Sequence, residues 1–327
     1  MNWKTILFCA NTKHKYHIFI STQIFLFLYF CAYRNANPPT EIHPYENFIV
    51  MGQFNYVSHN ISTWRNKWSE VVNLNKIIIA IPNDTSHPYP TGGRYKYYQA
   101  DWGFSSPYIN LANVIRENEN TQGFMMIHDD LILKSSILQK LGGKEWISTN
   151  VDLYNFSIYK NSTMESLTNA PKWWKRLPLC LDTFLKMFND ERLGPFKHQS
   201  TNQESFITVR RGASDMFYAF LPNSEQRISF LNLLDLFGEN NLFLECAIPT
   251  AILMMQEKFG VNLYDAPLCT DWKLRERKED SAEKSKEMVE NCAKKEIVKN
   301  KVFEAYHPIK IGFNHDWPQL FDYIKNL

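Results

Sequence analysis

Gly123-Phe-Met-Met-Ile-His128-Asp129-Asp130 is a short apolar run that ends abruptly in two adjacent carboxylates. An apolar run of this length, bounded by a break, predicts a buried strand over residues 123–127. The acids then lie at the carboxyl end of that strand, where open α/β sheets bind their ligands. Two neighbouring carboxylates repel each other unless a cation joins them, and their hard oxygen atoms suit Mg²⁺ or Mn²⁺. The alternative is a solvated turn, in which Asp is also common.

The segments on both sides of this stretch alternate between strand and helix patterns. Apolar runs predict the strands, and amphipathic segments predict the helices. This order of elements predicts an α/β fold: a Rossmann-like mixed sheet with flanking helices, in which parallel strands are joined by right-handed crossovers. The predicted strands are 47–51, 76–82, 94–98, 123–127, 206–209 and 215–220, and the predicted helices are 62–73, 106–118, 178–189, 226–238 and 243–259.

The composition narrows the classes of function. The 327 residues suffice for one large domain or two small ones, and a formal net charge of +2 gives no support for a nucleic acid partner. Only 12 residues are glycine, and the chain contains neither a Gly-x-Gly-x-x-Gly motif nor a Gly-Lys-Ser/Thr loop. Dinucleotide-binding and P-loop functions therefore lose their main support.

The N-terminal segment predicts a membrane anchor. Residues 16–33 carry no permanent charge and follow three lysines, which favours a signal-anchor with a cytosolic tail at 1–15. A polar stem at 34–46 and a lumenal domain at 47–327 would follow. The alternative is a cleaved signal peptide, although no good small-x-small cleavage site is present. Either way, the sequence predicts that the main domain faces the lumen or the outside, and the anchor predicts a type II protein of the Golgi or ER membrane.

Cysteine usage agrees with an oxidising compartment. Four cysteines follow the predicted anchor, namely Cys180, Cys246, Cys269 and Cys292. An even number predicts two disulfides, and three pairings are open. No Cys-x-x-Cys pair is present, which argues against a zinc ribbon or a thioredoxin-like site.

An anchor, a stem, an α/β half ending in Asp129-Asp130 and a late His307-Pro-Ile-Lys310 occur together in this chain. With these features the chain resembles the metal-dependent glycosyltransferases of the secretory pathway, which have the GT-A architecture; the exostosin-like transferases are one such group. There an Asp-x-Asp signature follows the strand that ends the nucleotide-binding half, and its last acid binds Mn²⁺. Asp130 matches that acid, whereas His128 stands at the first acidic position. The resemblance covers roughly residues 46–312.

The resemblance implies an activity and a metal site. The expected reaction moves a sugar from a nucleotide-diphosphate sugar to a glycan or glycoprotein acceptor, and the enzyme is expected to act alone or as a homo- or hetero-oligomer. Asp129, Asp130 and His307 are expected to hold Mn²⁺ or Mg²⁺, with Lys310 neutralising a diphosphate oxygen. His307 packed in a loop and Lys310 on the surface are the ordinary alternatives.

Further residues are expected to bind the donor or to act on the acceptor. By position in the architecture, Gln53 and Asn55 would face the nucleotide base and Asp101 the ribose. If the reaction inverts configuration it needs a base, for which Asp215 is the first candidate and Glu245 the second. A turn cap is the alternative for Asp215, and a salt bridge to an arginine of the core is the alternative for Glu245. If the reaction retains configuration, neither residue need be a base.

Two other functions compete with the transferase. A metal-dependent lumenal hydrolase would use more His and Asp ligands, often around two metals, whereas the nine histidines form no His-x-His or His-x-x-x-His cluster. A catalytically silent carbohydrate-binding module is favoured by His128 at the position of an acid. Such a module would not need Asp130 and His307 close together, so their separation in the folded chain discriminates between the functions.

Overall fold

The fold comes from a computed structural model, which describes residues 48–54, 61–82, 94–98, 106–150, 153–213, 215–270, 282–299, 302–309 and 317–326. The chain divides into two compact units, Met1–His43 and Pro44–Leu327, and every described residue belongs to the second unit. The predicted tail, anchor and stem lie outside the described residues, as do Asn55, Asp101 and Lys310. Within the described ranges, no helix combines the length and the apolar character that crossing a membrane requires.

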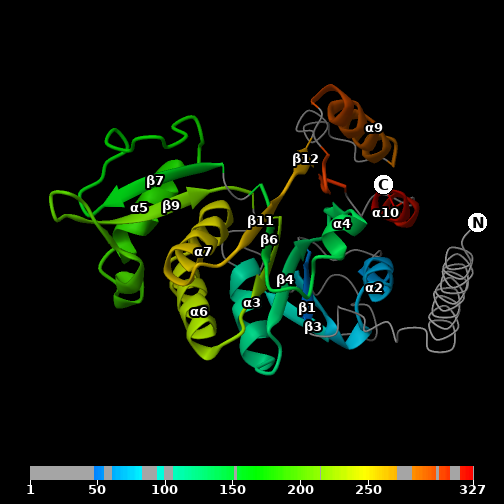
Figure 1. The fold of residues 1–327 in the computed structure, drawn as a ribbon, viewed down its shortest axis with the longest axis horizontal. Coiled ribbons are helices and arrows are strands. Elements are labelled where there is room, and N and C mark those ends of the chain that lie inside the picture. Colours follow the sequence, from blue (N-terminus) through cyan, green and yellow to red (C-terminus); the bar gives the residue numbers. More distant parts are fainter. Residues whose placement is uncertain are drawn as a thin grey trace, which may run out of the picture. The chain divides into compact units, whose positions relative to one another are not determined.

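The centre of the fold is a mixed, mostly parallel sheet with helices on its faces, compatible with a Rossmann-like architecture (Figure 1). The strand order is β11-β6-β10-β4-β1-β2-β3. All neighbouring strands are parallel except at β10, which runs antiparallel to both β4 and β6. The strands are β1 (Phe48–Gln53), β2 (Ile77–Pro82), β3 (Arg94–Tyr98), β4 (Gly123–His128), β6 (Trp146–Thr149), β10 (Met216–Phe220) and β11 (Leu263–Ala266).

The direction in which strands are added reverses beside β1. The chain proceeds from β1 outward to β2 and β3, and then returns to place β4 on the other side of β1. A crevice outside the carboxyl ends of the strands at such a switch point is the usual ligand site of an open α/β sheet. The register pairs Gln53 at the end of β1 with His128 at the end of β4.

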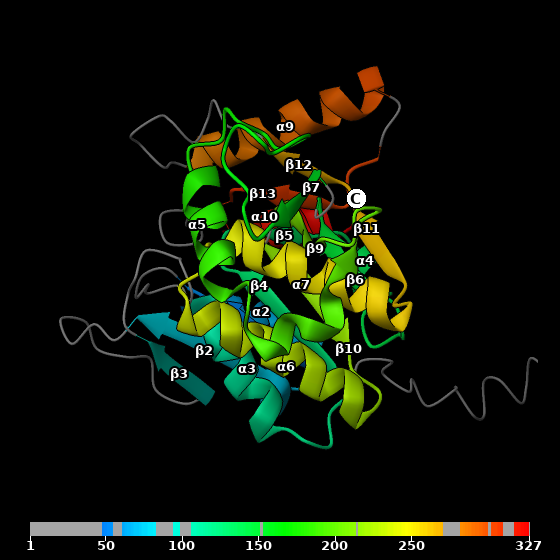
Figure 2. The same cartoon turned by 90° about the vertical axis from the view of Figure 1, so that its left-hand side faces the viewer.

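Both faces of the central sheet are buried, which explains why its strands are continuous apolar runs. Ile49 and Met51 belong to a hydrophobic cluster with residues of α3 (Ser106–Glu117), α6 (Ser224–Glu239) and α7 (Leu244–Phe259). Phe48 and Val50 belong to a second cluster with residues of α2 (Ile61–Ser69), α9 (Ala282–Lys299) and α10 (Trp317–Lys325). Figure 2 shows α3, α6 and α7 gathered on one side of the sheet.

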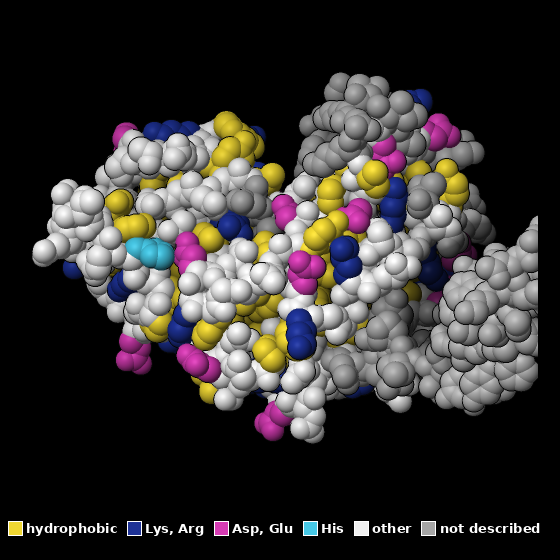
Figure 3. All heavy atoms as spheres, in the orientation of Figure 1, with side chains coloured by type: hydrophobic (Ala, Val, Ile, Leu, Met, Phe, Trp, Pro, Cys, Tyr) yellow, Lys and Arg dark blue, Asp and Glu magenta, His cyan; other side chains and the backbone are white. Residues whose placement is uncertain are grey.

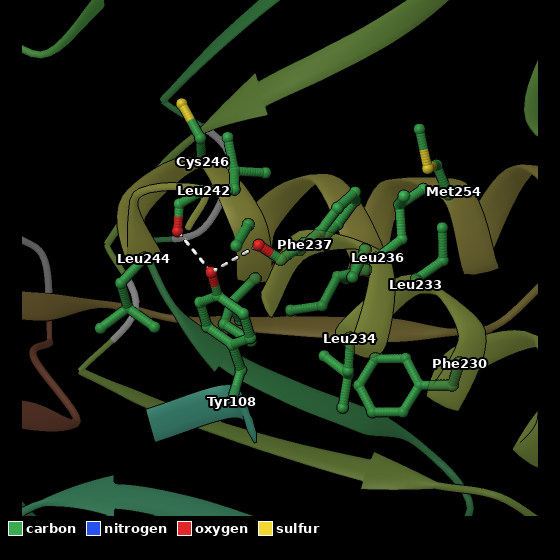
Figure 4. Packing of buried hydrophobic residues seen from close by; sticks show 14 of the residues in the cluster. Tyr108, Phe230, Leu233, Leu234, Leu236, Phe237, Leu242, Leu244, Cys246 and Met254 are labelled. Atoms are coloured by element: carbon green, nitrogen blue, oxygen red, sulfur yellow. Dashed lines mark hydrogen bonds between the residues drawn. The ribbon is translucent and has the colours of Figure 1, made fainter. Parts of the chain in front are cut away.

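Polar groups inside the first cluster are satisfied locally. The buried Tyr108 hydroxyl of α3 lies 3.1 Å from the backbone oxygen of Phe237 and 2.5 Å from that of Leu242 (Figure 4). These bonds tie α3 to the end of α6 and to the loop that leads into α7. Figure 4 shows the apolar side chains of α6 and α7 around this tyrosine.

Two smaller sheets flank the central one. One has the order β12-β13-β5 and carries His307 at the end of β13; the other has the order β7-β9-β8 and lies beside α5 (Figure 1). The strands of these sheets are β5 (Ile132–Leu133), β7 (Tyr154–Tyr159), β8 (His198–Gln199), β9 (Ser205–Arg211), β12 (Leu268–Thr270) and β13 (Ala305–His307). The remaining helices are α4 (Ser135–Leu138), α5 (Leu177–Met187) and the 3-10 helices η1 (Leu74–Lys76) and η2 (Glu191–Phe196).

Two disulfides form, as predicted, and the structure selects one of the three pairings. Cys180 of α5 pairs with Cys246 of α7, with a Cα–Cα distance of 6.7 Å. Cys269 of β12 pairs with Cys292 of α9, with a Cα–Cα distance of 6.0 Å. On the face drawn in Figure 3, the described basic side chains (dark blue) and acidic side chains (magenta) are interspersed, as a nearly balanced charge would suggest.

The sheet is mixed, as predicted. The run from residue 215 to 220 was expected to be a strand, without a predicted direction, and β10 is inserted antiparallel between β4 and β6. This reversal moves the start of β10 to the carboxyl edge of β4, where the predicted site lies.

Candidate functional site

The candidate site begins at the two central strand ends of the switch point. The Asp129 backbone N–H donates to the Gln53 carbonyl at 3.1 Å, so the chain leaving β4 is held against the end of β1. The Gln53 side chain is fully buried, and neither its Oε1 nor its Nε2 has a hydrogen-bond partner within the described part of the chain. A buried amide in this state costs free energy, which a ligand or a water molecule with complementary groups would recover.

Asp130 and His307 meet at this edge of the sheet. The Asp130 Oδ1 and His307 Nε2 atoms are 3.2 Å apart, and the two residues are 4% and 5% exposed. The local topology explains the meeting. Strand β5 starts two residues after Asp130, and β13 pairs with it antiparallel through Tyr306 and Ile132. The Ile309 N–H then donates to the Asp130 carbonyl at 2.6 Å. The predicted proximity of these two side chains is therefore present in the fold.

Asp215 joins the same cluster. Its Oδ1 atom lies 3.7 Å from His307 Nε2, and its backbone carbonyl accepts the His128 N–H at 2.8 Å. Because β10 runs antiparallel to β4, the residue before β10 necessarily lies beside the residues after β4. The sequence suggested Asp215 only as a base in the vicinity of an acceptor, without placing it next to His307.

The pair of Asp130 and His307 is chemically suited to a divalent cation. A separation of 3.2 Å fits a direct hydrogen bond, and it also fits neighbouring ligands of an octahedral ion, which lie about 3 Å apart at metal–ligand distances near 2.1 Å. No group of three or more His, Cys, Asp or Glu side chains arranged to hold a metal occurs within the described ranges. Mg²⁺-type sites commonly use one or two protein ligands and take the rest from substrate phosphates and water, so a two-ligand arrangement fits that class.

Glu245 lies elsewhere and already has a partner. It occupies the first turn of α7, and its Oε2 atom is 3.2 Å from Arg211 Nη2. The salt bridge weighed as the alternative for Glu245 is therefore present, and a third of the Glu245 side chain is exposed. The backbone carbonyl of Glu245 accepts the Gly212 N–H at 3.1 Å, which ties α7 to the segment leading to Asp215.

Thr149 is a site residue that the sequence did not suggest. It ends β6 at the same edge of the sheet, is fully buried, and its hydroxyl has no hydrogen-bond partner among the described residues. Strand β6 has only four residues, too few for a periodic signal, so no pattern could have pointed to its last residue.

Comparisons with known proteins assign no family. No family model matches the chain, and no curated protein sequence matches it. One solved structure to which the chain is similar is the mannose-1-phosphate geranyltransferase from Thermus thermophilus, with 8% identity over 68% of this chain and 74% of that chain and a TM-score of 0.29. A likeness of that size carries no functional argument, so the function has to be inferred from the site itself.

Proposed function

We propose that the protein is a metal-assisted glycosyltransferase with a GT-A-like domain, which moves a sugar from a nucleotide-diphosphate sugar to a glycan or glycoprotein acceptor. The observation that carries this proposal is the meeting of Asp130 and His307 at the carboxyl edge of the central sheet, 3.2 Å apart and almost completely buried. The edge lies at the switch point between β1 and β4, where open α/β sheets bind nucleotides.

The chemistry of each residue at this edge of the sheet suggests its role in the proposed reaction. Asp130 and His307 would hold Mn²⁺ or Mg²⁺, with Asp129 beside them, and the ion would supply Lewis-acid neutralisation of the diphosphate as it leaves. Lys310 would contribute a second positive charge to the same leaving group. Preorganised electrostatic stabilisation of this kind typically lowers a barrier by several kcal/mol.

The remaining proposed roles concern the donor and the acceptor. Gln53 would bind the nucleotide base together with Asn55, and Asp101 would bind the ribose. The unsatisfied amide of Gln53 supports its part of this assignment. In an inverting reaction, Asp215 would take the proton from the acceptor hydroxyl, because Asp215 lies beside His307 in the proposed metal site. Glu245 is less suited to this role because it is paired with Arg211.

The location is part of the proposal. Residues 16–33 would anchor the chain in the Golgi or ER membrane with the described domain in the lumen. The two disulfides support a compartment outside the reducing cytosol.

The test measures nucleotide binding and turnover with the full chain in detergent. UDP and GDP are added with Mn²⁺ or with excess EDTA while the melting temperature is followed, and hydrolysis of common UDP- and GDP-sugars is assayed in parallel. We expect one nucleotide to raise the melting temperature only when Mn²⁺ is present, because a ligand that binds the folded state alone stabilises it. Donor turnover should require the metal as well.

Substitutions assign the effect to the site. Asp130→Asn and His307→Gln should each abolish the metal-dependent shift and nearly all turnover, and Asp129→Ala should have an equal or smaller effect. Asp182→Asn, at an exposed position of α5, is the matched control and should behave like the wild type. Turnover that survives in Asp130→Asn or in excess EDTA contradicts the proposal. A protein that responds to no nucleotide would instead be a silent carbohydrate-binding module.

A further inference from the structure

The exposed side chain of Trp173 contacts an arginine that is paired with a glutamate. Trp173, between β7 and α5, is 67% exposed, more than any other large hydrophobic residue within the described ranges. Tyr154 contacts its ring at an interplanar angle of 75°, with the ring centroids 6.0 Å apart, and the Arg211 guanidinium lies 5.5 Å from the ring centroid. Glu245 in turn pairs with Arg211 at 3.2 Å. We call these four residues the Trp173 platform.

The platform is built from four separate segments. Tyr154 begins β7 and Arg211 ends β9, and the two are register partners in the small sheet. Glu245 comes from α7, and Arg211 also lies 5.0 Å from the ring of the largely buried Trp174. A single exposed aromatic residue is ordinary on a protein surface. Trp173 differs because its ring is held by neighbours from two other elements, Tyr154 of β7 and Arg211 of β9, which lowers the entropy lost when a ligand stacks on it.

The chemistry of the platform matches a sugar ring. The face of an aromatic ring is electron-rich, and the C–H groups on one side of a pyranose present a flat, slightly positive apolar surface to it. Hydroxyl groups at the rim of that sugar both donate and accept hydrogen bonds. The partly exposed Arg211 guanidinium supplies donors, and the Glu245 carboxylate, a third of whose side chain is exposed, supplies acceptor oxygens. One ring with one ion pair is too small for a stable protein interface, which typically buries about 1,600 Å².

The chain connects the platform to the proposed site. Arg211 precedes Asp215 by four residues, so their Cα atoms are at most about 14 Å apart. Two backbone bonds hold the intervening segment, from Gly212 N–H to the Glu245 carbonyl at 3.1 Å and from Ala213 N–H to the Asn150 carbonyl at 2.9 Å. The distance between the Cα atoms of Arg211 and Asp215 is therefore one that a short oligosaccharide can span.

We infer that the Trp173 platform binds a pyranose ring of the acceptor glycan, with the ring stacked on Trp173 and its hydroxyls paired with Arg211 and Glu245. The role as an acceptor subsite rests on the proposed transferase function, whereas the binding of a sugar does not. The platform would hold the acceptor at one ring while another ring reaches Asp215.

The first experiment is direct binding of defined glycans to the full-length protein. Cellohexaose, mannohexaose and chitohexaose are titrated by calorimetry into the wild type, Trp173→Ala, Trp173→Phe and Tyr323→Ala. Tyr323 is the matched control, because it is 57% exposed and lies on α10. We expect saturable binding of at least one hexasaccharide, weakened about tenfold in Trp173→Ala and less in Trp173→Phe, as loss of an aromatic contact predicts. Tyr323→Ala should bind like the wild type.

The outcomes separate this inference from the proposed function. No saturable binding of any of the three hexasaccharides, or equal affinity in the wild type and Trp173→Ala at unchanged melting temperature, overturns the platform. Trp173-dependent binding in a protein that responds to no nucleotide keeps the platform and refutes the transferase. If the protein does turn over a donor, Trp173→Ala should raise the acceptor KM about tenfold and leave kcat at saturating acceptor close to that of the wild type.

Discussion

Gly52 lies in closer contact with its surroundings than the other glycines for which the described part of the chain shows the neighbours of an added Cβ atom. It lies in the buried strand β1, directly before Gln53, and a Cβ atom placed on it would approach three ring atoms of Trp64, at 2.4, 2.7 and 2.9 Å. Such distances are far below ordinary contact, so one of the two residues has to move. Trp64 is fully buried, with its ring centroid 5.4 Å from that of Phe54 and 5.6 Å from that of Trp68. A large rigid ring confined in this way has little room to retreat.

We therefore expect Gly52→Ala to destabilise the protein strongly. Overpacking of a core typically costs about 1–3 kcal/mol, and the rigid ring places this site at the upper end. The reduced entropy of the unfolded chain returns roughly 0.5–1 kcal/mol, because Ala is less flexible than Gly. The net loss in the free energy of unfolding is about 2 kcal/mol. This is a large fraction of the total free energy of unfolding of a typical domain, which is roughly 5–15 kcal/mol.

Urea unfolding followed by circular dichroism measures this loss. The midpoint should fall while the slope stays constant, which indicates a loss of stability without a change in the surface exposed on unfolding. Gly194→Ala is the control, since a Cβ there meets nothing within 4 Å, and the same unfolded-chain entropy should raise stability by roughly 0.5–1 kcal/mol. In the double variant Gly52→Ala/Trp64→Leu, the smaller side chain relieves the clash, so the two costs should be less than additive by at least about 1 kcal/mol. A loss below about 1 kcal/mol for Gly52→Ala, or strict additivity, would refute the packing argument.

Two further substitutions test the supporting structure. Hydrogen bonds from Arg192 hold the pKa of Asp190 below its usual 3.8, so the ionised carboxylate adds stability above that pH, and this is lost as the pH falls through the lower folded-state pKa. Asp190→Asn should thus cost about 1 kcal/mol at neutral pH and progressively less as the pH is lowered below 3.8, measured by urea unfolding across that range; a cost that stays constant across the range would argue against it. Replacing Cys269 and Cys292 together by Ala opens a cross-link with a sequence separation of 23. Loop-closure entropy predicts a loss of about 3 kcal/mol, and an unchanged midpoint would contradict that expectation.

Local patterns were enough to predict the strands that form the centre of the site. The runs around Val50, Ile79 and Met125 are apolar on both faces because helices cover both sides of the sheet, and the corresponding strands are β1, β2 and β4. The end of β4 at His128 lies one residue beyond the predicted end of the strand at residue 127. The direction and the neighbours of each strand in the sheet were harder to predict from the sequence. The residues around Tyr218 read as a strand in either direction, and only the path of the chain through the β7–β9 sheet makes that strand antiparallel.

The composition of the site could be predicted only in part, for the same reason. The proximity of Asp130 and His307 was expected from a resemblance, and it is present in the fold. The approach of Asp215 depends on the direction of β10, which no local pattern contains. Thr149 ends a strand that is too short to be recognised from its pattern. The Trp173 platform joins residues from four segments that are far apart in the sequence, and no common motif links them. The roles of Asn55, Asp101 and Lys310 stay predictions, since these residues lie outside the described ranges.

The pairing of β13 with β5 has a consequence for biosynthesis. Asp130 leaves the ribosome 177 residues before His307, which reaches its partner only when β13 docks on β5. A nascent chain in which β13 has not yet docked carries the acid without its imidazole neighbour. Under the proposed chemistry, the metal site is therefore assembled only after β13 has been synthesised and has paired.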